Sequence, residues 1–503
     1  MRRRIPHPER MSTFPNVETE DTLDPRTPEG WASLRELGQG MVTEVLRYLQ
    51  TVRDRPVWQP LSDAVRQRLA GPLPTEGEGL EGAWRDFTRD VLPYPTGNIH
   101  PRFWGWVMGT GTPVGLFAEL LAATMNCHVA GYEDAAAAVE DQVLSWCREQ
   151  MGFPAGTSGL LVSGGSMGNL LGLAVARNAA VGDVRRTGLF GLPRMTLYAS
   201  RETHACVRRG VEVLGLGSES LRSLPVGEDF RVDVRALRAA IQRDRAEGLR
   251  PFCIVGNAGT VNTGSVDDLQ ALADVAEEEE LWFHVDGALG ALGVLSPKLR
   301  PLLAGLERAD SLVFDLHKWM YLQFDVACVL VRSKDAHRDT FAYQTEYLAQ
   351  ARRGLASRPS MFSEYGIELS RSFRALKVWL NLKAYGTARF ARLIDQNAAQ
   401  AQHLAARVDS EPELERLAPV SLHVVCFRYV GRRNASPEQL DAWNRELTCR
   451  LHETGTAVPS YTTLHGRYCL RVCINNHRTR REDLDLFVSE VLRLGREIAV
   501  AAQ

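Results

Sequence analysis

The chain has 503 residues, of which 45% are hydrophobic and 24% are charged, and its formal net charge is −2. This length suits one large domain with smaller ones attached, and the composition is ordinary for a soluble globular protein. Because 59 Lys and Arg residues balance 61 Asp and Glu residues, no net field favours a nucleic acid or an anionic membrane as partner.

Residues 1–26 begin with basic residues but contain no apolar run. A secretory signal needs such a run, so we expect a disordered extension here, with Met11 as an alternative start. No stretch approaches the ~18 consecutive apolar residues of a membrane span. The nine cysteines are scattered without a CxxC pair, which favours reduced, buried thiols in a cytoplasmic protein and no metal site.

Helical patterns dominate residues 27–99, and Pro56, Pro60 and the stretch 71–79 divide them into short pieces. Short helices bury little apolar surface alone. We therefore expect this segment to pack on the main domain or on a second subunit.

Residues 100–374 alternate helical segments with short apolar runs that end in polar or small residues. The runs are 195–200, 251–260, 281–288, 311–318 and 327–333, and an acidic amphipathic helix lies between the second and the third. This alternation predicts an α/β domain with a mostly parallel sheet covered on both faces. Ligands bind such sheets at the carboxyl ends of the strands.

Residues 375–503 predict a second, smaller α/β domain. A long helical stretch begins this part and is followed by the apolar run LHVVCFRYV, a helix near 437–454 and the alternating run RYCLRVCIN.

Two residues that close apolar runs indicate cofactor chemistry. Lys318 can serve as a Schiff-base nucleophile, although an exposed loop lysine is the commoner case. Asp286 lies 32 positions earlier. A buried carboxylate needs a cationic partner, and the protonated ring nitrogen of pyridoxal 5'-phosphate (PLP) is one, while a turn cap is the alternative. The small Ala288 would let a flat ring approach closely.

Two further features fit the same cofactor. Small residues at 163–166 precede an amphipathic helix, and the free N–H groups of a helix start bind phosphate, although an ordinary cap is equally compatible. His204 follows the run 195–200. Its flat imidazole can stack on a planar cofactor, but a lone histidine more often hydrogen-bonds locally. The order and spacing of the four features together favour a PLP enzyme.

With these residues the sequence resembles the group II PLP-dependent amino-acid decarboxylases, the family of aromatic-L-amino-acid, histidine and glutamate decarboxylases. The matching segments run in the family's order from His100 to the end: HPRFWGW, SGGSMGNLLGLAVAR, RETHACVRRG, GTVNTGSVDD, HVDGA, DLHKW and LSRSFRALKVW. The resemblance implies PLP fold type I, of the aspartate-aminotransferase type, in a homodimer with shared active sites. The implied reaction converts an L-amino acid to its amine and carbon dioxide through an aldimine and a quinonoid.

The resemblance also implies roles for individual residues. Lys318 would form the internal aldimine, Asp286 would pair with the ring nitrogen, and His204 would stack on the ring. The other cofactor contacts would be Ala288, Gly165, Ser166, Thr260, His317 and Asp315. Asp315 departs from the asparagine or serine of some members, and a carboxylate beside a phosphate is unfavourable, so it would instead orient a neighbour.

Family members supply the last proton from a tyrosine on a loop. Counting back without gaps from Leu369 places Phe362 at that position, with Tyr365 three residues on, and both residues stay candidates. Without a tyrosine, oxygen could trap the intermediate and release an aldehyde, as in plant relatives with phenylalanine there. An aminotransferase, a carbon–carbon lyase and a PLP-holding protein without turnover would also be compatible with this set of residues.

The sequence does not identify the amino acid. Residues 107–115 and 126–140 are expected to line the pocket, but they are less aromatic than expected for a dedicated aromatic-amino-acid enzyme. The candidate substrate residues are Trp106, His128, Tyr132, Phe362 and Arg471, the last as a carboxylate contact.

Overall fold

The computed structural model describes residues 22–182, 184–343, 351–432 and 435–501. Most of the extension expected over 1–26 therefore lies outside the described residues. The chain forms two compact units, one made of the residues up to Arg55 together with 72–89, and the other of 56–71 and 90–503.

The first unit is helical, as its sequence pattern predicts. Helix α1 spans Pro28–Gln50, begins with a proline and is capped by Thr27, whose hydroxyl accepts a hydrogen bond from the Gly30 amide at 3.1 Å. Helix α3 spans Gly79–Asp86. No residue of α1 is buried, and Trp31 keeps 48% of its surface exposed. The apolar side chains of α1 are thus at most partly covered within the described protomer.

The larger sheet of the second unit has seven strands. In spatial order they are β2 (Ser158–Val162), β8 (Ala327–Val331), β7 (Ser311–Asp315), β6 (Trp282–Asp286), β5 (Arg250–Asn257), β3 (Met195–Ser200) and β4 (Leu221–Leu224). Strands β4, β3, β5, β6 and β7 pair in parallel, and β8 is antiparallel to both its neighbours. The predicted mostly parallel sheet is confirmed.

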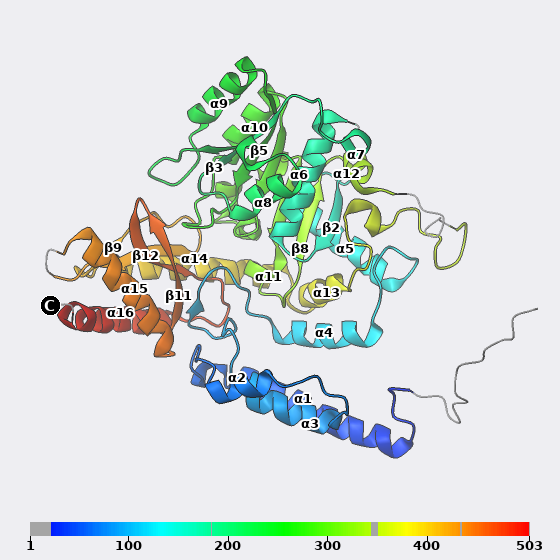
Figure 1. The fold of residues 1–503 in the computed structure, drawn as a ribbon, viewed down its shortest axis with the longest axis vertical. Helices are drawn as coiled ribbons and strands as arrows, with labels where there is room; N and C mark the ends of the chain where they lie inside the picture. The colour runs from blue at the N-terminus through cyan, green and yellow to red at the C-terminus, as the bar shows by residue number, and fades with distance from the viewer. Residues whose placement is uncertain (1–21, 183, 344–350, 433–434, 502–503) are drawn as a thin grey trace, which may run out of the picture. The chain divides into compact units, whose positions relative to one another are not determined.

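Helices cover both faces of this sheet (Figure 1). Successive residues of β5 point to opposite faces, and Ile254 packs in a core that includes α9 (Val234–Ala246) and α10 (Leu269–Glu278). Val255 packs in a core with α6 (Gly165–Val181) and α8 (Ala205–Val213). The remaining helices associated with this sheet are α4 (Pro113–Met125), α5 (Ala135–Gln150), α7 (Val184–Thr187), α11 (Leu316–Trp319), α12 (Lys334–Phe341) and α13 (Arg374–Tyr385).

A second sheet of five strands forms the C-terminal part. Its spatial order is β1 (Phe103–Trp104), β11 (Val458–Leu464), β12 (Arg467–Cys473), β10 (Val424–Tyr429) and β9 (Leu414–Arg416). Helices α15 (Pro437–Glu453) and α16 (Arg481–Ala501) lie beside it in Figure 1. Strand β1, although distant in sequence, pairs in parallel with β11 and so brings residues near 105 to this sheet.

The long helix expected after Arg374 is in fact two helices. Gly386 adopts φ +71° and ends α13, and α14 (Thr387–Asp409) follows directly. A left-handed conformation of this kind favours glycine. The unit also contains α2 (Asp63–Leu69). Short helical turns of the chain are Val52–Asp54, Phe87–Val91, Ser218–Ser220, Ala291–Leu295, Arg300–Leu303, Leu306–Arg308 and Phe362–Tyr365.

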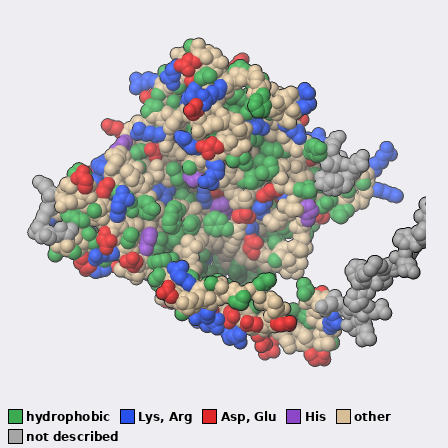
Figure 2. Space-filling view, in the orientation of Figure 1, with side chains coloured by type: hydrophobic (Ala, Val, Ile, Leu, Met, Phe, Trp, Pro, Cys, Tyr) green, Lys and Arg blue, Asp and Glu red, His purple; other side chains and the backbone are tan. Residues whose placement is uncertain are grey.

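The surface agrees with the near-neutral composition. Figure 2 shows Lys and Arg side chains interspersed with Asp and Glu on the visible face. Among the helices that the structure describes, none combines the length and the apolar character needed to span a bilayer.

Candidate active site

The carboxyl ends of three neighbouring strands meet at one cavity. Asn257 ends β5, Asp286 ends β6 and Asp315 ends β7, and all three line a cavity of about 500 Å³. The start of α6 closes one side of it, and Arg471, from β12 of the second sheet, lies on its wall. This is the position at which an open parallel sheet binds its ligand.

Lys318 enters the cavity from the single turn of α11. Its Nζ lies 2.6 Å from Oδ2 of Asp315, and the two side chains are 22% and 2% exposed. Burial disfavours the ammonium, but the carboxylates of Asp315 and Asp286 outweigh it and raise the pKa of Lys318. The lysine is therefore held as a cation until a ligand changes its surroundings.

Asp286 is 6% exposed and faces the same cavity. Its carboxylate accepts hydrogen bonds from the Ala288 amide at 3.1 Å and from the Asn169 side chain at 3.0 Å. Burial raises the pKa of Asp286, while Lys318 and His204 act in the opposite direction. A cationic ring nitrogen would supply the compensation that a buried carboxylate needs.

His204 caps the start of α8 and presents an exposed ring to the cavity. Its Nδ1 accepts a hydrogen bond from the Cys206 amide at 3.2 Å. Burial by the surrounding chain lowers the pKa of His204, and Lys318 lowers it further. The imidazole is therefore neutral near pH 7 and can lie flat against a planar group.

The start of α6 fits a phosphate. Gly164 is the N-cap and provides no side chain to cap the helix, so the first N–H groups of a 17-residue helix are left for a ligand. Gly164, Gly165 and Ser166 line the cavity. A Cβ at Gly165 would lie 3.0 Å from Cβ of Ala288 and 3.1 Å from Oδ2 of Asp315, which shows how closely this backbone approaches its neighbours.

Of two other predicted cofactor residues, one lines the cavity and one does not. His317 lines the cavity, and its Nδ1 accepts a hydrogen bond from the Val326 amide at 3.1 Å. Thr260 is fully buried, and its hydroxyl bonds to Thr263 at 3.0 Å. Thr260 does not line the cavity, although its neighbours Gly259, Val261 and Asn262 do.

The donor set fits PLP. Lys318 offers an amine, Asp286 a carboxylate, and α6 an uncapped helix start, and all three open on one cavity. Oδ1 of the buried Asp315 has no hydrogen-bond partner, so the site retains unsatisfied polar capacity for a ligand. Within the described residues, no cluster of three or more His, Cys, Asp and Glu is placed to hold a metal ion.

The predicted substrate residues divide into two groups. Trp106 and Arg471 line the cavity. Arg471 donates to the carbonyl oxygens of Val261 and Trp106 at 3.0 and 2.7 Å, and its buried Nη2 has no partner. The other predicted substrate residues, His128, Tyr132 and Phe362, do not line this cavity within one protomer, and neither does Tyr365, the predicted catalytic tyrosine.

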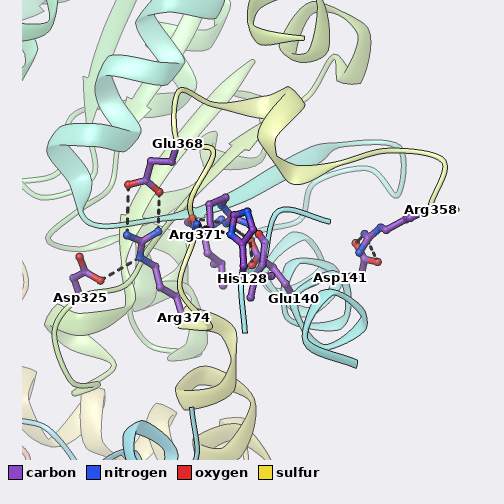
Figure 3. A network of polar contacts seen from close by, with 10 residues as sticks. His128, Glu140, Asp141, Asp325, Arg358, Glu368, Arg371 and Arg374 are labelled. Atoms are coloured by element: carbon purple, nitrogen blue, oxygen red, sulfur yellow. Dashed lines mark hydrogen bonds and ion pairs between the residues drawn. The ribbon is translucent and has the colours of Figure 1, made fainter. Parts of the chain in front are cut away.

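Those four residues lie around a different part of the chain. The His128 Nδ1 accepts a hydrogen bond from the Arg371 amide at 3.3 Å, next to the buried contact of Arg371 with Glu140 (Figure 3). Phe362 lies under the Arg371 guanidinium, and the Tyr365 hydroxyl bonds to Ser360 at 3.2 Å. The structure of one chain therefore does not bring them to Lys318.

Several cavity residues were not singled out from the sequence. Asn169, Asn257 and Asn262 sit in segments that were recognised, but asparagines in such segments carry no distinctive signal alone. Ser460 and Tyr461 come from β11, and only the pairing of β11 with β1 and β12 indicates that they approach the site.

The site and fold define a PLP-dependent enzyme, and comparison with known proteins specifies its class. The family model described as the pyridoxal-dependent decarboxylase conserved domain matches residues 64–430. The chain belongs to this family. It is a PLP-dependent carboxy-lyase of fold type I that decarboxylates an L-amino acid.

Similar proteins extend over nearly the whole chain. An aromatic-L-amino-acid decarboxylase of Bacillus atrophaeus is 34% identical over 471 residues, which cover 93% of this chain and 96% of that protein. Phenylacetaldehyde synthase of Petunia hybrida is 27% identical and covers 93% and 94%. The crystal structure of Oryza sativa TDC with PLP and tryptamine has a TM-score of 0.87 at 26% identity, and covers 95% of this chain and 100% of that one.

Proposed function

We propose that this enzyme decarboxylates aromatic L-amino acids, with Lys318 as the residue that binds the cofactor covalently. The observation that carries the proposal is the meeting of Lys318, Asp286 and His204 in one cavity with an uncapped helix start. Three half-exposed aromatic side chains line the same cavity, Trp106 (50% exposed), Phe324 (53%) and Tyr461 (56%). They offer apolar surfaces for an aromatic substrate. The 34% identical relative is named for such substrates.

Bound PLP supplies an aldehyde that captures amines and a ring that accepts the electron pair released with carbon dioxide. Asp286 would pair with the ring nitrogen and keep it protonated, and His204 would lie against the ring. The N–H groups at Gly165 and Ser166 would hold the phosphate. Arg471, which lines the cavity, would be the contact for the substrate carboxylate.

A panel of the standard amino acids, assayed for carbon dioxide and amine, tests the substrate class. We expect Phe, Tyr or Trp to give the highest kcat/KM. A preference for glutamate or another acidic amino acid would refute the aromatic assignment.

A second candidate function differs from the first in its product, which would be an aldehyde in place of an amine. Two relatives, from Petunia hybrida and Arabidopsis thaliana, are named phenylacetaldehyde synthase, and Phe362 occupies the position counted for the proton-donating tyrosine. In that reaction the amino acid, oxygen and water give aldehyde, carbon dioxide, ammonia and hydrogen peroxide. Assays for amine, aldehyde and peroxide decide between the two. Amine without peroxide, and loss of amine in Tyr365→Phe, would support simple decarboxylation with Tyr365 as donor.

We further propose a homodimer in which each subunit completes the other's site. Its support is that His128, Tyr132, Phe362 and Tyr365 lie away from the cavity in one protomer, and that α1 buries no residue. In this proposal residues 27–99 help to form the dimer, 100–374 bind the cofactor, and 375–503 form the smaller domain. The nine free cysteines favour a cytoplasmic location.

A further inference from the structure

A line of four hydrogen bonds runs from Trp282 to Asp286. The Trp282 Nε1 lies 2.8 Å from the Ser311 Oγ, which lies 2.7 Å from the His284 Nδ1. The His284 Nε2 lies 2.8 Å from the Asn169 Oδ1, and the Asn169 Nδ2 lies 3.0 Å from Oδ2 of Asp286. The last acceptor is the carboxylate that faces the cofactor site.

The sequence builds this line from two strands and one helix. Trp282, His284 and Asp286 alternate along β6 and therefore point to one face of the sheet. Ser311 is the register partner of His284 on β7. Asn169 comes from α6, which covers this face.

The helix is shaped to leave room for the histidine. Gly172 lies one turn after Asn169 on α6, and a Cβ at Gly172 would lie 2.6 Å from the His284 Cε1. Asn169, His284 and Ser311 are each 0% exposed. Burial lowers the pKa of His284 to about 3, so the ring is neutral, with one nitrogen donating and the other accepting.

The chemistry of the two ends fixes the direction of every bond. A tryptophan N–H can only donate, and an ionised carboxylate can only accept. Ser311 therefore accepts from Trp282 and donates to the His284 Nδ1. His284 then donates from Nε2 to the Asn169 carbonyl, whose amide donates to Asp286. Bonds aligned in one sense polarise one another and strengthen the last one.

We propose that Asn169, His284, Ser311 and Trp282 are positioning residues that keep Asp286 ionised and directed at the ring nitrogen of the cofactor. This inference rests on the proposed role of Asp286. The titratable groups that also face Asp286 are Lys318 from α11, His204 and Cys206 from the start of α8, and Asp315 from β7. Asn169 is the contact from α6 and holds Oδ2 of Asp286, while the Ala288 amide holds Oδ1.

Ser311→Ala removes the middle of the line without touching Asp286. The His284 Nδ1 is then left buried without a donor, and the Trp282 Nε1 is left without its acceptor. The outer bonds no longer reinforce the bond from the His284 Nε2 to Asn169, so the bond from Asn169 to Asp286 weakens. We expect the cofactor dissociation constant, measured by fluorescence titration of the apoenzyme, to rise about tenfold. The acidic limit of cofactor binding should move up by about one pH unit, because the carboxylate is less stabilised.

The chain contains a matched control. Ser158 on β2 is buried, and its hydroxyl lies 2.8 Å from Nδ1 of the buried His337, whose pKa burial also lowers to about 3. Ser158→Ala thus removes the same group from the same kind of pair in the same sheet. We expect it to leave cofactor affinity and its pH dependence unchanged, even if Tm falls.

A remote variant keeps the test decisive if Ser311→Ala does not fold. Trp282→Phe removes the outermost N–H together with part of the ring, four residues along the strand from Asp286, or about 13 Å, and should weaken cofactor binding about twofold. Cofactor affinities equal to those of the unaltered enzyme in both Ser311→Ala and Trp282→Phe would overturn the proposal. Asp286→Asn then shows which proposal is wrong. If Asp286→Asn also binds the cofactor normally, the proposed role of Asp286 is wrong. If it binds the cofactor weakly, the role of Asp286 stands and only the positioning role of the four residues is wrong.

Discussion

Asp315 determines the state of Lys318 before the cofactor binds. Its carboxylate lies 2.6 Å from Nζ and raises the pKa of the lysine, yet only the neutral amine attacks an aldehyde. Asp315→Asn should lower this pKa by about one unit, so the rate of cofactor capture by the apoenzyme should rise about tenfold at each pH below it. Stopped-flow absorbance between pH 6 and 10 measures this. Asp325→Asn, whose carboxylate pairs with Arg374, is the control, and coincident profiles for the two variants would contradict the argument.

The contribution of Glu413 to the stability of the fold depends on pH. Arg496 donates to it at 2.8 Å and lowers its pKa, assisted by Arg432 and Tyr429. Because the folded pKa lies below the unfolded value, the stabilisation is present above pH ~4.3 and is lost as the pH falls through the folded pKa.

Glu413→Gln should therefore lower the free energy of unfolding by about 1 kcal/mol at pH 7, a value reduced for the exposure of the arginines. The difference should vanish near pH 3. Urea unfolding at the two pH values measures it, and an equal difference at both would show that the charge is not the cause.

For single residues, the sequence predicted which side chains belong to the site better than it predicted how those side chains are oriented. Lys318, Asp286 and His204 were predicted because their residue types and the ends of apolar runs restrict what they can do, and all three line the cavity. Thr260 was expected from its segment, but its hydroxyl turns into its own loop to bond Thr263. Asn169 was missed because hydrogen bonding between a helix and a strand has no local sequence signature.

At the scale of elements, α5 is tied to the chain before α13 by a fully buried ion pair. Arg371 and Glu140 are each 0% exposed in their side chains, and Arg371 also donates to the carbonyl oxygens of Val129 and Leu161 (Figure 3). Burial raises the pKa of Glu140, and Arg371 opposes this. Two charges in such a place stabilise the fold only while they remain paired.

Arg371→Leu should lower the free energy of unfolding by about 3–5 kcal/mol, because Glu140 is left buried without its partner. The double variant Arg371→Leu/Glu140→Leu should lose less than the sum of the two single variants. Denaturant midpoints for the four proteins form a double-mutant cycle. Additive losses would mean that the pair itself contributes little.

Element boundaries were predictable where local chemistry defines them. The predicted run 195–200 has the same bounds as β3. A short apolar run flanked by polar residues is typical of a buried strand, so its ends could be read from the sequence. The division of α13 from α14 was missed, although Gly386 marks it, because a glycine inside an apolar-periodic stretch is also compatible with one continuous helix. The pairing of β1 with β11 joins residues over 350 positions apart, and no local pattern specifies such a contact.

At the scale of the whole molecule, α4 presents an uncovered apolar face. Leu121 is 49% exposed, and Phe117, Leu120 and Met125 are exposed on the same helix. A contiguous face of this kind is typical of a subunit interface. If this face forms the proposed dimer, Leu121→Lys should shift the protein towards monomer and reduce decarboxylation with it.

Leu486→Lys on α16 is the matched control, because this leucine is 47% exposed on a helix of the C-terminal part. It should leave the mass and the activity unchanged. Light scattering after size-exclusion chromatography measures the mass. A Leu121→Lys protein that remains dimeric would exclude this face from the interface.

Borohydride reduction shows directly whether Lys318 carries the cofactor. Reduction fixes a lysine-bound cofactor as a stable secondary amine, so peptide mass spectrometry should find the pyridoxyl adduct on the peptide that contains Lys318. The Lys318→Ala protein should show no adduct and no carbon dioxide release. An adduct on another lysine, or none after incubation with excess PLP, would mean that Lys318 does not bind the cofactor.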